Sequence, residues 1–180
     1  VYVVMPLALI GIVSGSLVAV FQNNVKRMLA YSSIAQVGYM VLGISLASVT
    51  GLTGGIVHLF NHGLMKGALF LALGAVTYRI GAERLADFGG LSRRMPWTTS
   101  AIVVGGLSLI GVPPTAGFVS KWYLVSATLE QGLWPLALLV LLVLLTLLTL
   151  LALLALLALL ALLAVLLLLF LLPHPTLLVP

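Results

Sequence analysis

Charged residues and cysteine are what this sequence has least of. Only 6% of its 180 residues are charged and 63% are hydrophobic, whereas a soluble domain carries about 25% charged residues. So few charges cannot cover a water-exposed surface, which excludes a soluble globular protein and indicates an integral membrane protein. The absence of cysteine excludes disulfides and thiolate metal sites. No glycine-rich phosphate loop and no Ser/His/Asp set occurs, so the sequence indicates no self-contained enzyme active site.

Long apolar stretches predict an all-α, polytopic bundle of about five to six transmembrane helices. Stretches long enough to cross a bilayer lie at 1–21, 28–48, 51–78 and 96–130. The chain begins inside an apolar run at Val1, with no charged segment or cleavage site of a signal peptide. We therefore expect a fragment of a larger, many-helix subunit, with a transmembrane domain over 1–132.

The stretch 96–130 is too long for one straight span and is expected to break in its middle. The residues that mark this break are Gly111, Pro113, Pro114 and Gly117. Proline removes a backbone donor and strains the preceding helical turn. In a membrane, an interrupted helix is tolerated where it is buried in protein or lines a cavity. The sequence therefore predicts one helix interrupted near Pro113–Pro114.

The remaining stretch, 133–172, consists almost entirely of Leu, Ala and Val. It is nearly twice as long as one bilayer crossing requires. Over 146–164 small residues recur every third position, a period that winds them around a helix instead of placing them on one face. Open interpretations are one overlong lipid-facing helix, two helices or an artefactual tail. Residues 173–180 are expected to form a short tail.

Basic residues between the apolar stretches predict the orientation. Lys26 and Arg27 follow the first stretch, and the connection 79–94 holds four arginines. Two crossings separate these basic loops, so they share a side, which the positive-inside rule makes cytoplasmic. The excess of basic residues therefore signals orientation and not nucleic-acid binding. Glu83 and Asp87 are spaced for paired acid–base work, but their arginine-rich surroundings favour a solvated loop or short surface helix.

Three ionisable residues lie inside the stretch 51–78. His58, His62 and Lys66 are spaced i, i+4, i+8, so they share one helical face. A mid-membrane charge costs roughly 3 kcal/mol on insertion scales and usually marks a functional site. Histidine both accepts and donates a proton near neutral pH. Such a row can pass protons through bound water, and Lys121, four residues after Gly117, can extend it.

Alternative interpretations of these residues remain open. His-x-x-x-His is a metal-ligand spacing, but no third ligand is evident and Lys66 would repel a cation. The histidines can also be hydrogen-bonding groups that join helices, although the mid-span lysine favours a proton relay. Lys121 can instead extend to the membrane interface. We predict no metal and no cofactor.

Four ordered motifs resemble a known family. They read VKRMLAYSSIAQVGYMVLG, HLFNHGLMKGALFL, GGLSRRMPWT and GVPPTAGFVSKWYL. In this order and spacing they resemble the antiporter-like membrane subunits of respiratory complex I (NADH:quinone oxidoreductase) and of bacterial multisubunit sodium/proton antiporters. The resemblance covers roughly residues 1 to 135. It implies a many-helix subunit in which buried lysines and histidines carry protons.

The resemblance also implies roles for individual residues. The proton relay would comprise Lys26, His58, His62, Lys66 and Lys121. The combination of RRMPW with GVPPTAGFVSKWY looks most like the D-type antiporter subunit, with a proton-pumping subunit of complex I as the alternative. Partners would be other membrane subunits, the lipid bilayer, protons and, as a second candidate ion, sodium. The location would be a bacterial inner membrane. The family's earlier glutamate–lysine pair and its first interrupted helix have no counterpart in this sequence.

Overall fold

The structure is a computed structural model that describes residues 3–141. The helices in this part of the chain are α1 (Val4–Val20), α2 (Val25–Ser45), α3 (Val49–Ile80), the short 3-10 helix η1 (Leu85–Phe88), α4 (Leu91–Arg94), α5 (Pro96–Ile110) and α6 (Ala116–Glu130). Residues 134–141 are also helical. Within this range no strand forms beyond one isolated bridge, so the all-α prediction is confirmed. The predictions for 142–172 and for the tail 173–180 lie outside the described residues.

Two of these helices, α2 and α3, are long and apolar enough to cross a membrane, and α1 and α5 are shorter apolar helices. α2 begins three residues earlier than the predicted span, because Asn24 caps it. The Asn24 side chain accepts hydrogen bonds from the backbone N–H groups of Lys26 and Arg27 at 3.0 and 3.1 Å. An asparagine at this position satisfies donors that the first turn leaves free. Lys26 and Arg27 therefore lie in the first turn of α2 and not in a link before it.

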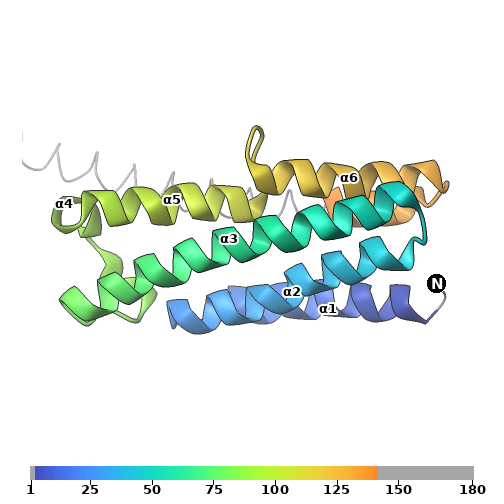
Figure 1. Cartoon of the computed structure of the whole chain (residues 1–180). Helices are drawn as coiled ribbons and strands as arrows, with labels where there is room; N and C mark the ends of the chain where they lie inside the picture. Colours follow the sequence, from blue (N-terminus) through green and yellow to red (C-terminus); the bar gives the residue numbers. More distant parts are fainter. Residues whose placement is uncertain (1–2, 142–180) are drawn as a thin grey trace, which may run out of the picture. The chain divides into compact units, whose positions relative to one another are not determined.

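α3 is the central helix of the described part. It contacts α2, α5 and α6, while α1 packs against α2. Figure 1 shows α5 and α6 following one another along one side of α3. α3 begins after Ser48, whose hydroxyl accepts from the N–H of Gly51 at 3.0 Å, and it ends at Gly81 with a φ of +67°. Because both half-helices contact α3, residues on its inner face can reach both sides of the break.

α1 and α2 approach each other through glycine. A Cβ atom added at Gly15 would lie 2.6 Å from the backbone nitrogen of Ala35, and one added at Gly38 would lie 2.8 Å from the carbonyl oxygen of Ala8. Small residues allow helix backbones in a membrane to come this close. Next to this contact, Gln36 and Tyr39 of α2 reach His58 of α3.

The predicted helix interruption is confirmed. α5 ends at Ile110, α6 begins at Ala116, and the residues between them are not helical. Gly111 has a φ of +93°, a conformation that only glycine adopts without strain. A Cβ atom at Gly117 would overlap the carbonyl oxygen of Ser108. The two half-helices therefore meet closely at a glycine, and the carbonyl groups at the end of α5 are left without helical N–H partners.

The connection after α3 folds back onto the start of α2. Val25 N–H donates to Glu83 O at 3.0 Å, and Leu85 N–H donates to Asn23 O at 3.0 Å. Lys26 Nζ donates to Glu83 Oε1 at 2.9 Å, and the Lys26 ammonium lowers the pKa of this exposed carboxyl group. We call these contacts the loop clasp. Glu83 thus pairs with Lys26 and not with Asp87, in keeping with a surface loop and not an acid–base pair.

Candidate functional site

The three predicted residues of α3 share a buried face. His58 is fully buried, His62 is 9% exposed and Lys66 is 5% exposed. The rings of His58 and His62 are stacked, with their centroids 6.3 Å apart. Polar side chains at this depth need internal hydrogen-bond partners. The i, i+4, i+8 spacing therefore places the three residues as the sequence predicts, and the neighbouring helices must supply their partners.

His58 has partners on two different helices. Its Nε2 lies 2.9 Å from Gln36 Oε1 on α2, and its Nδ1 lies 2.8 Å from Ser120 Oγ on α6. Tyr39 of α2 contacts the ring edge-on, with centroids 5.7 Å apart. Both ring nitrogens are therefore engaged, and His58 cannot also bind a metal ion without losing one of these contacts.

Lys66 is bound to α2. Its Nζ donates to the carbonyl oxygen of Leu29 and to Ser32 Oγ, and it lies 6.0 Å from the centroid of the Phe70 ring. The ammonium group is thus solvated by a backbone carbonyl and a hydroxyl in place of water. No carboxylate lies within ion-pair distance of it among the described residues.

Lys121 is bound to the end of the first half-helix. It is 1% exposed, and its Nζ donates to the carbonyl oxygens of Leu109 at 3.1 Å and Ile110 at 2.7 Å. These carbonyls belong to the last turn of α5, where a helix carries partial negative charge. The Tyr39 ring lies 5.3 Å from Lys121 Nζ. This burial excludes the alternative that Lys121 extends to the membrane interface.

The structure does not bring Lys26 to this buried row. Its side chain is 41% exposed and is paired with Glu83 in the loop clasp. The residues predicted to form a relay therefore fall into two places: four are buried on α3 and α6, and Lys26 lies at the start of α2. Among the described residues no three His, Cys, Asp or Glu side chains gather into a possible metal site.

Several partners of the row were not foreseen. Ser120 and the carbonyl oxygen of Leu29 receive no prediction from the sequence. Because Ser120 lies next to Lys121 in an otherwise apolar helix, its position could have indicated a polar partner for the row. A backbone carbonyl leaves no signal in a sequence, because every residue carries one. Nothing in the sequence assigns Gln36 and Tyr39 of α2 to His58, although both contact it.

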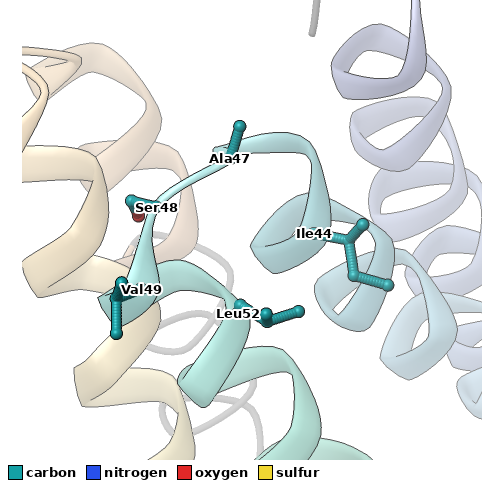
Figure 2. Close-up of a pocket in the computed structure, with 5 residues that line it drawn as sticks. All are labelled: Ile44, Ala47, Ser48, Val49 and Leu52. Carbon is teal, nitrogen blue, oxygen red and sulfur yellow. The ribbon is translucent and has the colours of Figure 1, made fainter.

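A shallow pocket lies away from the row. Figure 2 shows Ile44, Ala47, Ser48, Val49 and Leu52 around the turn between α2 and α3. Its volume is about 420 Å³ and its walls are apolar. It contains none of the buried ionisable residues. We therefore place the candidate site along the buried row and not at this pocket.

The sequence matches a described family and several characterised proteins. The family described as NADH:quinone oxidoreductase/Mrp antiporter, TM, matches residues 1–149. The NADH-quinone oxidoreductase subunit N of Desulforudis audaxviator is 49% identical over 128 residues, which are 71% of this chain and 26% of that protein. The chain thus spans about a quarter of the length of this relative.

Solved structures show the same relationship. A chain in the structure of the Mrp complex from Dietzia sp. DQ12-45-1b matches with a TM-score of 0.78 and 35% identity, covering 82% of this chain and 28% of that one. A chain of respiratory complex I from Thermus thermophilus with bound Aureothin matches with a TM-score of 0.65 and 34% identity, covering 78% of this chain and 32% of that one. The protein therefore belongs to the NADH:quinone oxidoreductase/Mrp antiporter transmembrane family, whose members are integral membrane subunits.

Proposed function

We propose that the protein is a proton-translocating membrane subunit of an NADH:quinone oxidoreductase of the complex I type. The observation that carries the proposal is the buried row of His58, His62 and Lys66, continued by Lys121 on the interrupted helix. The 49% identity to a subunit N supports the choice of complex. This identity favours a complex I subunit, which the sequence analysis gave as the alternative, over the D-type antiporter subunit.

In the proposed function, protons move between the two buried lysines by way of the histidines. Lys66 and Lys121 each hold a proton against backbone carbonyls, and His58 has contacts to α2 and α6 between them. Groups without a fixed counter-charge release protons more readily in a low-dielectric site. Lys26 would take part as an outer proton carrier at the loop clasp. The electron-transfer chemistry would belong to other subunits.

A second candidate is a subunit of a multisubunit cation/proton antiporter. Its support is the likeness to the Mrp complex, which has a TM-score of 0.78. In either case, the partners would be further membrane subunits and the bilayer, and the transported ion would be the proton, with sodium as a second ion in the antiporter. The proposed location is a bacterial inner membrane with the basic loops on the cytoplasmic side.

The test uses the full-length subunit in its assembled complex, reconstituted into vesicles. We expect Lys66→Gln to lower proton translocation by roughly a hundredfold, the low end of what a positioned acid–base group contributes. Arg79→Gln is the matched control, since Arg79 is an exposed cation in the last turn of the same helix. Unchanged proton translocation by Lys66→Gln, in a complex that assembles normally, would refute the proposed relay.

The same vesicles distinguish the two candidate complexes. Proton uptake driven by NADH in the presence of a quinone identifies the oxidoreductase. Proton movement driven by an imposed sodium gradient, without NADH, identifies the antiporter. We expect the first response, and a sodium-driven response alone would assign the chain to the second candidate.

A further inference from the structure

In the described part of the chain, His58 lies within hydrogen-bond distance of side chains on two other helices, α2 and α6. Gln36 on α2 is 3% exposed and Ser120 on α6 is fully buried, as is His58 itself. The distances are 2.9 Å from His58 Nε2 to Gln36 Oε1 and 2.8 Å from His58 Nδ1 to Ser120 Oγ. A buried polar group that loses its hydrogen bond destabilises the folded state. Each charge state of His58 must therefore find its partners among these side chains.

Gln36 determines which ring nitrogen of His58 carries a proton in the neutral state. The atom that faces Nε2 is the carbonyl oxygen Oε1, which can only accept. Nε2 must therefore donate, and a neutral imidazole with its hydrogen on Nε2 has its lone pair on Nδ1. The basic nitrogen of His58 then faces α6 and the Ser120 hydroxyl.

Ser120 can satisfy His58 with or without the extra proton. Its Oγ lies 2.8 Å from His58 Nδ1 and 3.1 Å from the carbonyl oxygen of Gly117. When His58 is neutral, the hydroxyl donates to Nδ1. When His58 is protonated, Nδ1–H donates to Oγ and the hydroxyl turns to donate to Gly117 O. Both states leave the ring fully hydrogen-bonded, and only a hydroxyl hydrogen changes direction.

We propose that Gln36 is a positioning residue that fixes a proton on Nε2 of His58, and that the Ser120 hydroxyl passes a second proton to Nδ1 and takes it back from the same nitrogen. This inference deepens the proposed function and rests on it. In the transfer step, the Ser120 O–H bond breaks as the Nδ1–H bond forms, and Oγ takes a replacement proton from a hydronium ion on the α6 side. The hydronium becomes water, and the imidazolium formed carries the positive charge.

The neighbouring histidine lacks such an arrangement. His62 Nδ1 is buried and has no hydrogen-bond partner among the described residues. The other titratable groups around His58 are His62 and Lys66 on α3, Tyr39 on α2 and Lys121 on α6. Hydrogen-bond partners on both ring nitrogens therefore distinguish His58 from His62 in the described structure.

The test compares variants that differ by one polar group, in the full-length subunit within its assembled complex. Ser120→Ala removes the hydroxyl and Ser120→Thr retains it. Thr128→Val is the matched control, because Thr128 is a fully buried residue of α6 whose hydroxyl also binds the carbonyl three residues earlier, at 2.7 Å, without contacting His58. Gln36→Glu retains an acceptor for Nε2, and Gln36→Met removes it at similar size.

Proton translocation in vesicles is the first readout. We expect Ser120→Ala and Gln36→Met to lower its rate roughly tenfold, the ratio that corresponds to one buried hydrogen bond. Ser120→Thr should recover the rate to within about twofold, and Thr128→Val should leave it unchanged. Wild-type rates in Ser120→Ala and Gln36→Met, or equal loss in Thr128→Val, would overturn the inference.

Nitrogen-15 NMR of histidine-labelled complex is the second readout, with the His58 signal assigned by its loss in His58→Gln. We expect neutral His58 to carry its proton on Nε2 in the wild type and to become a mixture of both tautomers in Gln36→Met. A proton fixed on Nδ1 in the wild type would refute the assignment. If His58→Gln itself leaves proton translocation intact, the proposed function fails. If only the Ser120 and Gln36 variants do so, this inference fails alone.

Discussion

At the scale of single residues, the two buried lysines both satisfy their amine groups with backbone carbonyl oxygens. Lys66 and Lys121 each direct the amine toward backbone carbonyl oxygens of another helix, and neither is paired with a carboxylate in the described part of the chain. A fixed counter-charge would hold the proton and oppose its release. Carbonyl groups solvate the cation without trapping it, which suits residues that are proposed to exchange protons.

The exposed Lys26 differs from the buried lysines because it pairs with a carboxylate, Glu83, and this pair makes the stability depend on pH. Lys26 lowers the pKa of Glu83 from its ordinary value of 4.5. The ion pair therefore stabilises the folded protein fully at pH values above 4.5. This contribution is lost as the pH falls through the lowered pKa, when Glu83 becomes protonated. We expect Glu83→Gln to lower the unfolding temperature of the full-length subunit at pH 7, and the difference from the wild type to vanish at strongly acidic pH.

Differential scanning fluorimetry over a pH series measures this difference. Asp87→Asn is a useful control, because Asp87 accepts from the Arg84 N–H at 3.1 Å and makes no contact with Lys26. If the difference in unfolding temperature between Glu83→Gln and the wild type persisted unchanged in strong acid, the charge of the Glu83 carboxylate would not be what stabilises the loop clasp.

The positions of the row could be predicted from the sequence, but its contacts could not. A spacing of four residues fixes which side chains share a helical face, because the helix repeat is a local property. It does not say which helix lies opposite. Ser120 reaches His58 from 62 residues away, and Lys66 binds a carbonyl 37 residues earlier. Such contacts depend on how helices pack, which no local pattern encodes.

At the scale of helices, glycine sets how close α1 and α2 come. A Cβ at Gly15 would lie 2.6 Å from the Ala35 backbone nitrogen, so Gly15→Ala must push the two helices apart. We expect a loss of roughly 1–3 kcal/mol in the free energy of unfolding, as for other overpacked sites. Thermal or denaturant unfolding of the full-length subunit measures it.

Gly74→Ala provides the comparison. Gly74 lies in α3, is exposed, and has no atom within 4 Å of an added Cβ. Alanine there should be neutral or stabilise the helix by up to about 1 kcal/mol. Equal destabilisation by both variants would mean that the loss of glycine flexibility, and not the close contact, explains the effect at Gly15.

The bounds of the helices show where local rules succeed. The interruption between α5 and α6 was predictable because glycine and proline act on their own backbone. The predicted start of α2 is three residues late, because two cations interrupt the apolar pattern there while the Asn24 cap lets the helix begin before them. The loop clasp is not predicted either, because it joins segments 60 residues apart, at the isolated backbone β-bridge between Asn24 and Arg84.

At the scale of the whole molecule, the described part supports the proposed orientation. The loop clasp joins the start of α2 to the connection after α3, so the two basic segments meet at one end of the bundle. The absence of cysteine from the sequence makes the orientation directly testable. We expect a cysteine introduced as Arg93→Cys to react with an impermeant maleimide from the cytoplasmic side.

Ser48→Cys is the opposite marker, because Ser48 lies in the turn between α2 and α3, at the other end of these helices. It should react from the non-cytoplasmic side. Labelling is compared with the same complex lacking an introduced cysteine. If both cysteines react from the same side, α3 does not cross the membrane as proposed, and if the sides are exchanged, the orientation is inverted.

The Lys121 amine links the two half-helices α5 and α6 at the point where the backbone helix is interrupted. It does so by donating to the last carbonyls of α5 from a side chain that belongs to α6. A protonated amine has three hydrogens to donate and a neutral one has two. In the proposed relay, loss of the Lys121 proton would therefore remove one donor and the charge from the contact between α5 and α6, so that protonation and the strength of this contact would change together.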